Sequence, residues 1–157
     1  MTRAIGGPVR SGQLGFTLLE LLVVLLIVAL SVVLVVPSLN RARLAIMVHS
    51  TAYELAANLR TARAAAQAAN AERVLLIDLT GRQYWAEGIV GRRQLPQTIA
   101  VELTVPESER IGATGGRVRF FPDGGASGAK LVLKDGKATA AVLVDWLNGD
   151  VRVQLRP

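Results

Sequence analysis

The chain has 157 residues, a hydrophobic fraction of 51% and a formal net charge of +6 at pH 7. It contains no cysteine, which excludes disulfides and thiolate metal sites, and one histidine, which leaves little basis for Ser–His catalysis. The length suits one modest domain plus an anchor, because residues 37–157 provide enough chain for a single core. The basic balance suits nucleic acid, anionic lipid or an acidic partner, and does not choose among them.

The first structural feature is an apolar stretch, residues 16–36, that follows a short basic leader. Residues 1–15 contain two arginines and no acidic residue, and residues 21–36 are all apolar except Ser31. As a helix, residues 16–36 would be about 31 Å long, close to the roughly 30 Å hydrocarbon core of a bilayer. We therefore predict a transmembrane helix. The leader arginines orient it with the N-terminus in the cytoplasm and the later residues across the membrane.

The junction of leader and helix, Gly15 to Glu20 (GFTLLE), resembles the processing signal of type IV pilins and type II secretion pseudopilins. Glycine lies before the scissile bond, phenylalanine follows it, and glutamate is the fifth residue of the mature chain. The resemblance implies that a prepilin peptidase cleaves between Gly15 and Phe16 and methylates the new amino group of Phe16. Residues 1–15 would be the cleaved leader, and the helix would act as membrane anchor and later as filament core.

Glu20 is the only charged residue inside the apolar stretch, and a charge in that setting is costly enough to indicate a function. In the family, such a glutamate pairs with the N-terminal ammonium of a neighbouring subunit, which implies an assembly role here. A buried charge is tolerable when it is paired, and the first turn of a helix favours an anion. The alternative is a carboxylate that reaches the lipid headgroups and has no further role.

Residues 37–72 are predicted to continue the helix with one apolar face toward the head. Pro37 lies where many family members carry a helix-kinking proline, and it can bend the helix because it lacks an N–H and clashes with the preceding turn. Apolar residues then step by three or four, as expected of a helix that packs one stripe against a core. The stripe consists of Leu44, Val48, Ala52, Leu55, Leu59, Ala62, Ala66 and Ala69.

Residues 73–157 are predicted to form a β-rich head that covers this stripe. Six or seven mostly antiparallel strands are expected, with residues 88–97 and 106–116 as loops and Asn148-Gly149 as a two-residue hairpin turn. The strands are residues 73–79, 83–87, 98–105, 117–121, 130–134, 138–147 and those after Gly149. The fold class is α+β, and Trp85 and Trp146 are predicted to fill the core between helix and sheet.

The head also resembles the GspH/FimT family of pseudopilins, through residues 120–124 (FFPDG), Ser127-Gly128, Val144-Asp145 and Asn148-Gly149. The resemblance implies a minor pseudopilin similar to the H component of a type II secretion system, at or near the pseudopilus tip, with a periplasmic head. Its function would be protein export across the outer membrane. The implied partners are other pseudopilins, the prepilin peptidase and the inner-membrane assembly platform. Because type IV pili share the signal and the helix, a FimT-like minor pilin that binds DNA for uptake stays open.

No enzymatic activity, cofactor or metal is predicted. His49 lies on the predicted helix and is expected to be a solvated or partly buried helix residue. The glycine-rich residues 124–130 lack the spacing of a phosphate-binding loop and precede a strand, so we predict a turn. Asp123, Asp145 and Asp150 are not spaced as in a calcium loop, and turn or cap roles are predicted for them.

Basic side chains of the head form the last candidate site. Arg117 and Arg119 share one strand face, and Arg152 and Arg156 share another near the C-terminus. Such a patch can follow DNA phosphates. The alternative is an ordinary solvated sheet face whose charges keep the sheet edge from aggregating. On this second interpretation, nucleic acid is not a partner.

Overall fold

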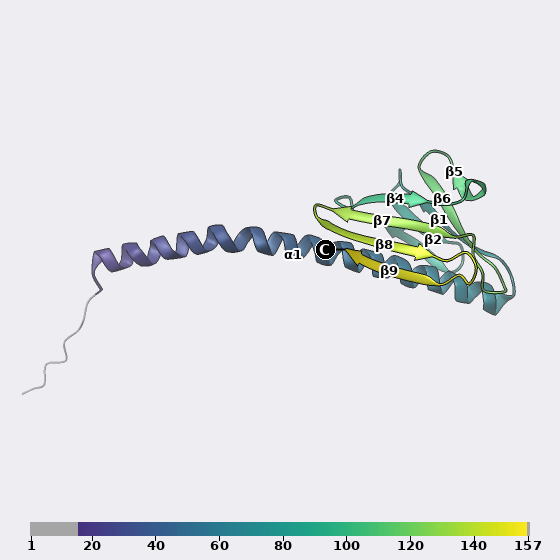
Figure 1. Cartoon of the computed structure of the whole chain (residues 1–157), viewed down its shortest axis with the longest axis horizontal. Coiled ribbons are helices and arrows are strands. Elements are labelled where there is room, and N and C mark those ends of the chain that lie inside the picture. The colour runs from purple at the N-terminus through teal and green to yellow at the C-terminus, as the bar shows by residue number, and fades with distance from the viewer. Residues whose placement is uncertain (1–15, 157) are drawn as a thin grey trace, which may run out of the picture. The chain divides into compact units, whose positions relative to one another are not determined.

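The computed structural model describes residues 16–156, and within that range it leaves out the side chains of residues 32–44 and of Arg156. The chain divides into one unit that ends at Leu39 and another that runs from Asn40 to Pro157. Helix α1 (Leu18–Ala69) contributes to both units, and every described strand belongs to the second (Figure 1). The predicted α+β class is confirmed.

Both ends of α1 carry the local signals that begin and end helices. The hydroxyl of Thr17 accepts a hydrogen bond from the backbone N–H of Glu20 at 3.2 Å, so Thr17 caps the first turn. Asn70 ends the helix in the left-handed conformation, with φ of 45°. The backbone N–H groups of Asn70 and Ala71 then donate to the carbonyls of Gln67 and Ala66, which is a Schellman motif.

The predicted apolar stripe of α1 is buried from Val48 to Ala66. It packs into one hydrophobic core with strand residues such as Leu75, Phe120 and Leu131. Ala69 is exposed because it belongs to the last turn, beyond the sheets, and the side chain of Leu44 lies outside the described residues. Burial of this stripe is the main apolar contact that holds the helix to the head.

The strands form two antiparallel sheets. The order in the first sheet is β3-β2-β1-β6-β5 and in the second β4-β7-β8-β9. The first sheet contains β1 (Arg73–Asp78), β2 (Gln83–Ala86), β3 (Val90–Gln94), β5 (Arg110–Ile111) and β6 (Gly115–Phe120). The second contains β4 (Ala100–Thr104), β7 (Ala129–Asp135), β8 (Ala138–Val144) and β9 (Val151–Arg156), and a short 3₁₀ helix, η1 (Glu107–Glu109), precedes β5.

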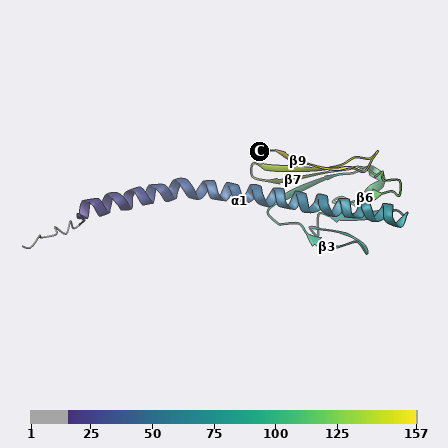
Figure 2. The same ribbon diagram turned by 90° about the horizontal axis from the view of Figure 1, so that it is seen from below.

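Within the second unit, α1 contacts both sheets. In Figure 2, β7 and β9 lie on one side of the helix and β3 on the other. The side-chain amide of Asn58 donates to the hydroxyl of Tyr84 on β2 at 2.9 Å, and the guanidinium of Arg60 donates to the carbonyl of Val151 on β9 at 2.6 Å. One helix therefore joins two sheets that share few strand contacts of their own.

Three details of the predicted head are wrong. The described residues contain nine strands, because β3 lies in the predicted loop 88–97 and β5 lies in the predicted loop 106–116. Strand β8 ends at Val144, so the link to β9 is a six-residue turn instead of a two-residue hairpin. Trp146 belongs to that turn and is 69% exposed, so it does not fill the core.

Candidate assembly site

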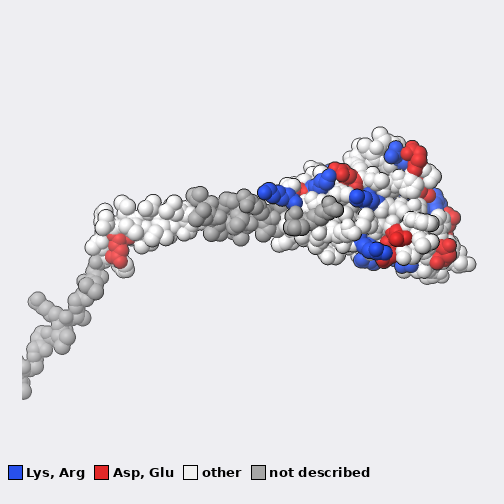
Figure 3. Space-filling model, viewed as in Figure 1, with Lys and Arg blue, Asp and Glu red and all other residues white. Residues whose placement is uncertain are grey.

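The described part of the first unit is a helix that exposes its apolar side chains on all sides. Among its large apolar residues, the exposed fraction runs from 44% at Val23 to 84% at Leu18. Figure 3 shows this segment as white apart from acidic atoms near its start, and Glu20 is its only charged residue. A helix that is apolar all round needs lipid or protein around it, so this surface is the first candidate for assembly.

Glu20 projects from the first turn of this helix and is exposed. Its backbone N–H is held by Thr17, and Thr-x-x-Glu is the sequence pattern of a capping box. The sequence interpretation did not use this pattern, although it predicts the helix start directly. The carboxylate lies beside the positive end of the helix dipole and makes no hydrogen bond or ion pair with another described residue, so it can accept an external cation.

Several predicted features of the N-terminal part stay predictions. Gly15 and the leader lie outside the described residues, and so does the side chain of Pro37, whose predicted bend is untested. Within the part of the chain that the structure describes, no helix is both long and apolar enough to cross a membrane. The predicted span of residues 16–36 extends past Ser31, where the described side chains break off.

The basic pair on β6 is bound to a buried carboxylate. Arg117 and Arg119 donate from their Nε atoms to the two carboxylate oxygens of Glu109, at 2.7 and 2.9 Å, and Arg119 also pairs with Glu72 at 2.7 Å. Burial raises the pKa of Glu109, but hydrogen bonds and charge from Arg119 and then Arg117 more than offset this, so the pKa is lowered. The arrangement fastens η1 and β5 to β6.

The described arginines of the predicted DNA-binding set are divided between the two sheets. Arg117 and Arg119 lie in the first sheet and Arg152 in the second, and Arg152 donates to Asp150 at 2.7 Å. Each of these three guanidinium groups therefore already binds a carboxylate of the chain, which leaves less charge for phosphates. The side chain of Arg156 lies outside the described residues, and DNA binding by this set stays a prediction.

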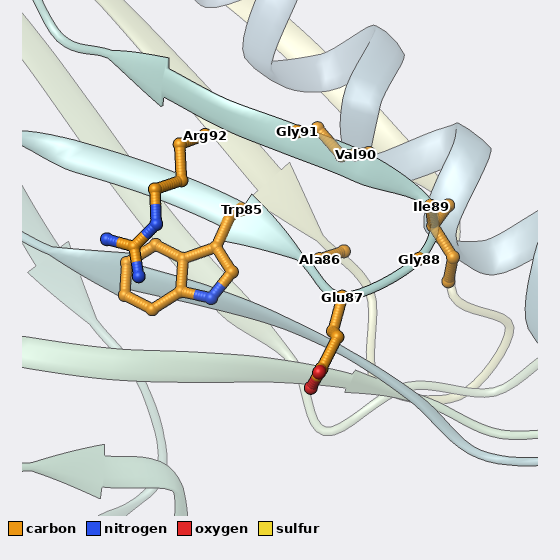
Figure 4. Close-up of a pocket in the computed structure, with 8 residues that line it drawn as sticks. All are labelled: Trp85, Ala86, Glu87, Gly88, Ile89, Val90, Gly91 and Arg92. Carbon is orange, nitrogen blue, oxygen red and sulfur yellow. The ribbon is translucent and has the colours of Figure 1, made fainter.

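A shallow depression of about 320 Å³ lies along the β2–β3 hairpin (Figure 4). The guanidinium of Arg92 lies over the ring of Trp85, 4.6 Å from its centroid, in a cation–π contact. Trp85 is only half-buried and alternates along β2 with the buried Tyr84 and Ala86, so the prediction that it fills the core is wrong. The other six lining residues offer a single ionisable group, the carboxylate of Glu87. This lining supplies no nucleophile and no acid–base pair, so it gives no basis for catalysis.

The family motifs of the head lie in two segments, residues 120–128 and residues 144–149. These two segments meet beside the last turns of α1. Gly149, with φ of 63°, lies so close to residues 121–128 that an added Cβ would stand 2.3 Å from the carbonyl oxygen of Gly124. That same carbonyl accepts a hydrogen bond from Nε of Arg63 on α1 at 3.1 Å. The backbone N–H of Ala126 donates to the carbonyl of Trp146 at 3.1 Å. The motifs therefore form a junction that ties both sheets to the helix.

The remaining predicted residues have local roles. The carboxylate of Asp123 accepts the N–H of Gly125, and that of Asp145 accepts the N–H of Leu147, each at 2.9 Å, as turn residues do. His49 lies on α1 and is half-buried. Among the described residues, no three His, Asp or Glu side chains gather as metal ligands would.

Two family profiles match the chain. The family described as type II transport protein GspH matches residues 51–149, which cover most of the head, and the prokaryotic N-terminal methylation motif matches residues 10–36. The type II secretion system protein H of Xanthomonas campestris pv. campestris is 33% identical over 147 residues, which cover 92% of this chain and 86% of that protein.

Solved structures share the fold at low sequence identity. The minor pseudopilin EpsH from the type 2 secretion system of Vibrio cholerae matches with a TM-score of 0.55 and 11% identity, over 69% of this chain and 96% of that one. The type IV minor pilin FimU of Pseudomonas aeruginosa matches with a TM-score of 0.50 and 16% identity, over 69% of this chain and 92% of that one. These structures establish the fold and do not separate the two kinds of filament.

Proposed function

This chain belongs to the family of type II transport protein GspH, and on that premise we propose that it is a minor pseudopilin of a type II secretion system. It serves as a structural subunit in protein export across the outer membrane. The observation that carries this function is the family match over residues 51–149, because it covers the head, the part that differs between filaments. The N-terminal motif alone fits type IV pili equally well.

The chain is a membrane-anchored subunit of a periplasmic pseudopilus whose partners are other pseudopilins. In our proposal, the prepilin peptidase hydrolyses the Gly15–Phe16 bond and methylates the amino group of Phe16. The helix then holds the chain in the inner membrane, with the N-terminus in the cytoplasm and the head in the periplasm. An inner-membrane assembly platform moves it into the filament, at or near the tip, where neighbouring helices replace lipid around the exposed apolar side chains.

Glu20 has a defined part in this transfer. Its carboxylate lies four residues after Phe16, at the positive end of α1, and accepts the N-terminal ammonium of a neighbouring subunit. A paired charge is tolerable among apolar helices, and an unpaired one is not. The pairing therefore sets the register between helices and favours neighbours whose leader has been removed.

The head contributes recognition and no chemistry in this proposal. The depression at Trp85 has no catalytic set, and the arginines of β6 are bound in structural ion pairs. We accordingly propose that the chain is not an enzyme and uses no cofactor. Its exposed surface is available for contacts with other subunits.

Mass spectrometry of the chain purified from a host with prepilin peptidase tests the processing step. We expect a mature chain that begins at methylated Phe16. A chain that still begins at Met1 contradicts every pilin-type function for this protein. The matched control is Gly15→Leu, which we expect to retain the leader because a bulky side chain hinders the backbone at the cut.

A secretion assay with Glu20→Ala tests the assembly role. We expect the Glu20→Ala chain to be processed and present in the membrane, with a strong loss of export. Export with Glu20→Asp should lie between that of the wild type and that of Glu20→Ala. Unimpaired export by Glu20→Ala would remove the pairing role and would leave membership of the pseudopilus intact.

The second candidate is a minor pilin of a type IV pilus, the kind of filament to which the structurally similar FimU belongs. A gel-shift with duplex DNA and the full chain in detergent separates the two functions. Salt-sensitive binding that is lost in Arg152→Ala and Arg156→Ala would favour the pilus. Absence of binding is the result expected of a secretion pseudopilin.

A further inference from the structure

Two large apolar side chains protrude from the turn between β8 and β9. Trp146 and Leu147 are 69% and 70% exposed, more than any other large apolar side chain of the described head. The turn lies at the end of the head where α1 finishes, away from the point at which the chain enters (Figure 1). Surface positions in a polar turn gain nothing for folding from such side chains, so their identity calls for a different explanation.

The turn holds these side chains in one place through its own hydrogen bonds. The carboxylate of Asp145 accepts the N–H of Leu147 at 2.9 Å, and its carbonyl accepts the N–H of Gly149 at 2.9 Å. The side-chain oxygen of Asn148 accepts the N–H of Asp150 at 2.9 Å. A contact made by this turn therefore loses little backbone entropy on binding.

The neighbouring loop holds the backbone of the turn without covering its side chains. Gly128, with φ of 81°, lies so close that an added Cβ would stand 3.2 Å from Cβ of Trp146. Together with the bond from Ala126 to the Trp146 carbonyl, this fixes the base of the indole and leaves its ring outside. The loop of residues 121–128 thus holds the backbone of the turn rigidly below the exposed side chains of Trp146 and Leu147.

The size of this surface limits what can bind there. The two exposed side chains offer on the order of 300 Å², since an aromatic side chain buries roughly 150–250 Å². A stable complex between free partners buries about 800 Å² on each side. The pair is too small to capture a freely diffusing protein, but it suits a partner that another contact already holds beside it, because tethering raises the effective concentration.

We propose that Trp146 and Leu147 dock on an apolar, uncharged patch of the neighbouring pseudopilin head in the same filament. This rests on the proposed function, because the packed helices supply the tether. The nearby charges do not compete, since Arg152 pairs with Asp150 within the chain at 2.7 Å. The docking contact is therefore hydrophobic, and added salt does not weaken it.

Photo-cross-linking in secreting cells of the native host tests this docking point with the full chain. Three variants carry the photoreactive residue: Leu147→p-benzoylphenylalanine at the turn, Leu22→p-benzoylphenylalanine on the apolar helix, and Lys137→p-benzoylphenylalanine as the control. Lys137 is also exposed in a turn, at the opposite end of β8. We expect adducts with another pseudopilin, identified by mass spectrometry, from the turn and the helix and none from the control. Adding Trp146→Ser lowers the yield at the turn about tenfold, as expected for an aromatic anchor.

The helix variant separates failure of this inference from failure of the proposed function. A pseudopilin adduct at Leu22 with none at Leu147, or with only lipid or a secreted protein there, overturns the docking point and leaves the function standing. If Leu22 forms no adduct with a pseudopilin, both the docking point and the proposed function are overturned. An adduct that joins the turns of two copies also overturns the docking point, because subunits that follow one another in a filament contact each other through two different surfaces.

Discussion

Helix α1 passes through two regions that place apolar side chains in opposite environments. From Phe16 to Ser31 every described side chain is exposed, and from Val48 to Ala66 one face is buried against two sheets. The first segment is apolar on all sides, whereas the second alternates apolar and polar residues with the helical period. The chain therefore supplies the cover for one segment and relies on lipid or other subunits for the other.

This difference assigns separate energetic roles to the two regions. Substitutions in the head core should change the free energy of unfolding, and substitutions in the exposed helix should change assembly alone. Substitutions in each region, measured against matched controls, test that division. Each unfolding measurement uses denaturant titration of the full chain in detergent, followed by near-ultraviolet circular dichroism.

Phe120→Ala should destabilise the head by about 3–5 kcal/mol, because it removes a fully buried ring from the shared core. Leu22→Ala is the matched substitution in the exposed helix and should leave the unfolding midpoint unchanged while lowering export. Equal effects on unfolding would break the division between the two regions.

Gly149→Ala should destabilise the head by roughly 3 kcal/mol. The residue needs a positive φ, and an added Cβ would also press on the carbonyl of Gly124. Gly136→Ala is the control, because Gly136 has φ of 59° with open space around it, and it should cost only about 1 kcal/mol. Similar losses for both would mean that the junction of the two motifs does not depend on close approach.

Glu109→Gln should destabilise the head by about 2 kcal/mol, since it leaves two arginines without their shared carboxylate. The lowered folded-state pKa of Glu109 means that the wild type has this stabilisation above the ordinary glutamate pKa and loses it as pH falls through the folded value. The acid limb of the stability–pH curve should therefore flatten in Glu109→Gln. An unchanged limb would show that the ion pairs contribute nothing.

Arg92→Ala should have the smallest effect, about 0.5–1 kcal/mol, because it removes one surface cation–π contact from Trp85. Arg93→Ala serves as its control, since the nearest carboxylate, that of Glu54, lies 4.0 Å away and both groups are more than half exposed. A larger loss of unfolding free energy for Arg93→Ala than for Arg92→Ala would contradict a stabilising role of the cation–π contact.

The sequence predicts most of the architecture because periodicity and turn residues carry strong signals. The 3.6-residue period locates the buried face of α1, short apolar runs between turn residues locate β1 and β7, and the alternation of charged and apolar residues locates β6. The sequence pattern does not predict strand β3, because residues 91–94 are exposed at a sheet edge and show no alternation of apolar and polar residues. Its strand pairing becomes visible only in three dimensions.

The candidate surfaces are harder to predict because they depend on contacts distant in sequence. Glu109 lies in a polar loop, and its burial follows from Arg117 and Arg119, which reach it from β6. The spacing of those two arginines on one strand face was the available signal for a shared acidic partner. Trp146 looks like a core residue by type, and only the length of the β8–β9 turn reveals that it protrudes.

Deletion of the gene in the organism that carries it, with export and surface pili measured in parallel, tests the central claim most directly. We expect that export of type II secretion substrates is lost, that pili persist, and that the wild-type chain restores export. Normal export in the deletion strain together with lost pili would contradict a secretion pseudopilin and assign the chain to a type IV pilus.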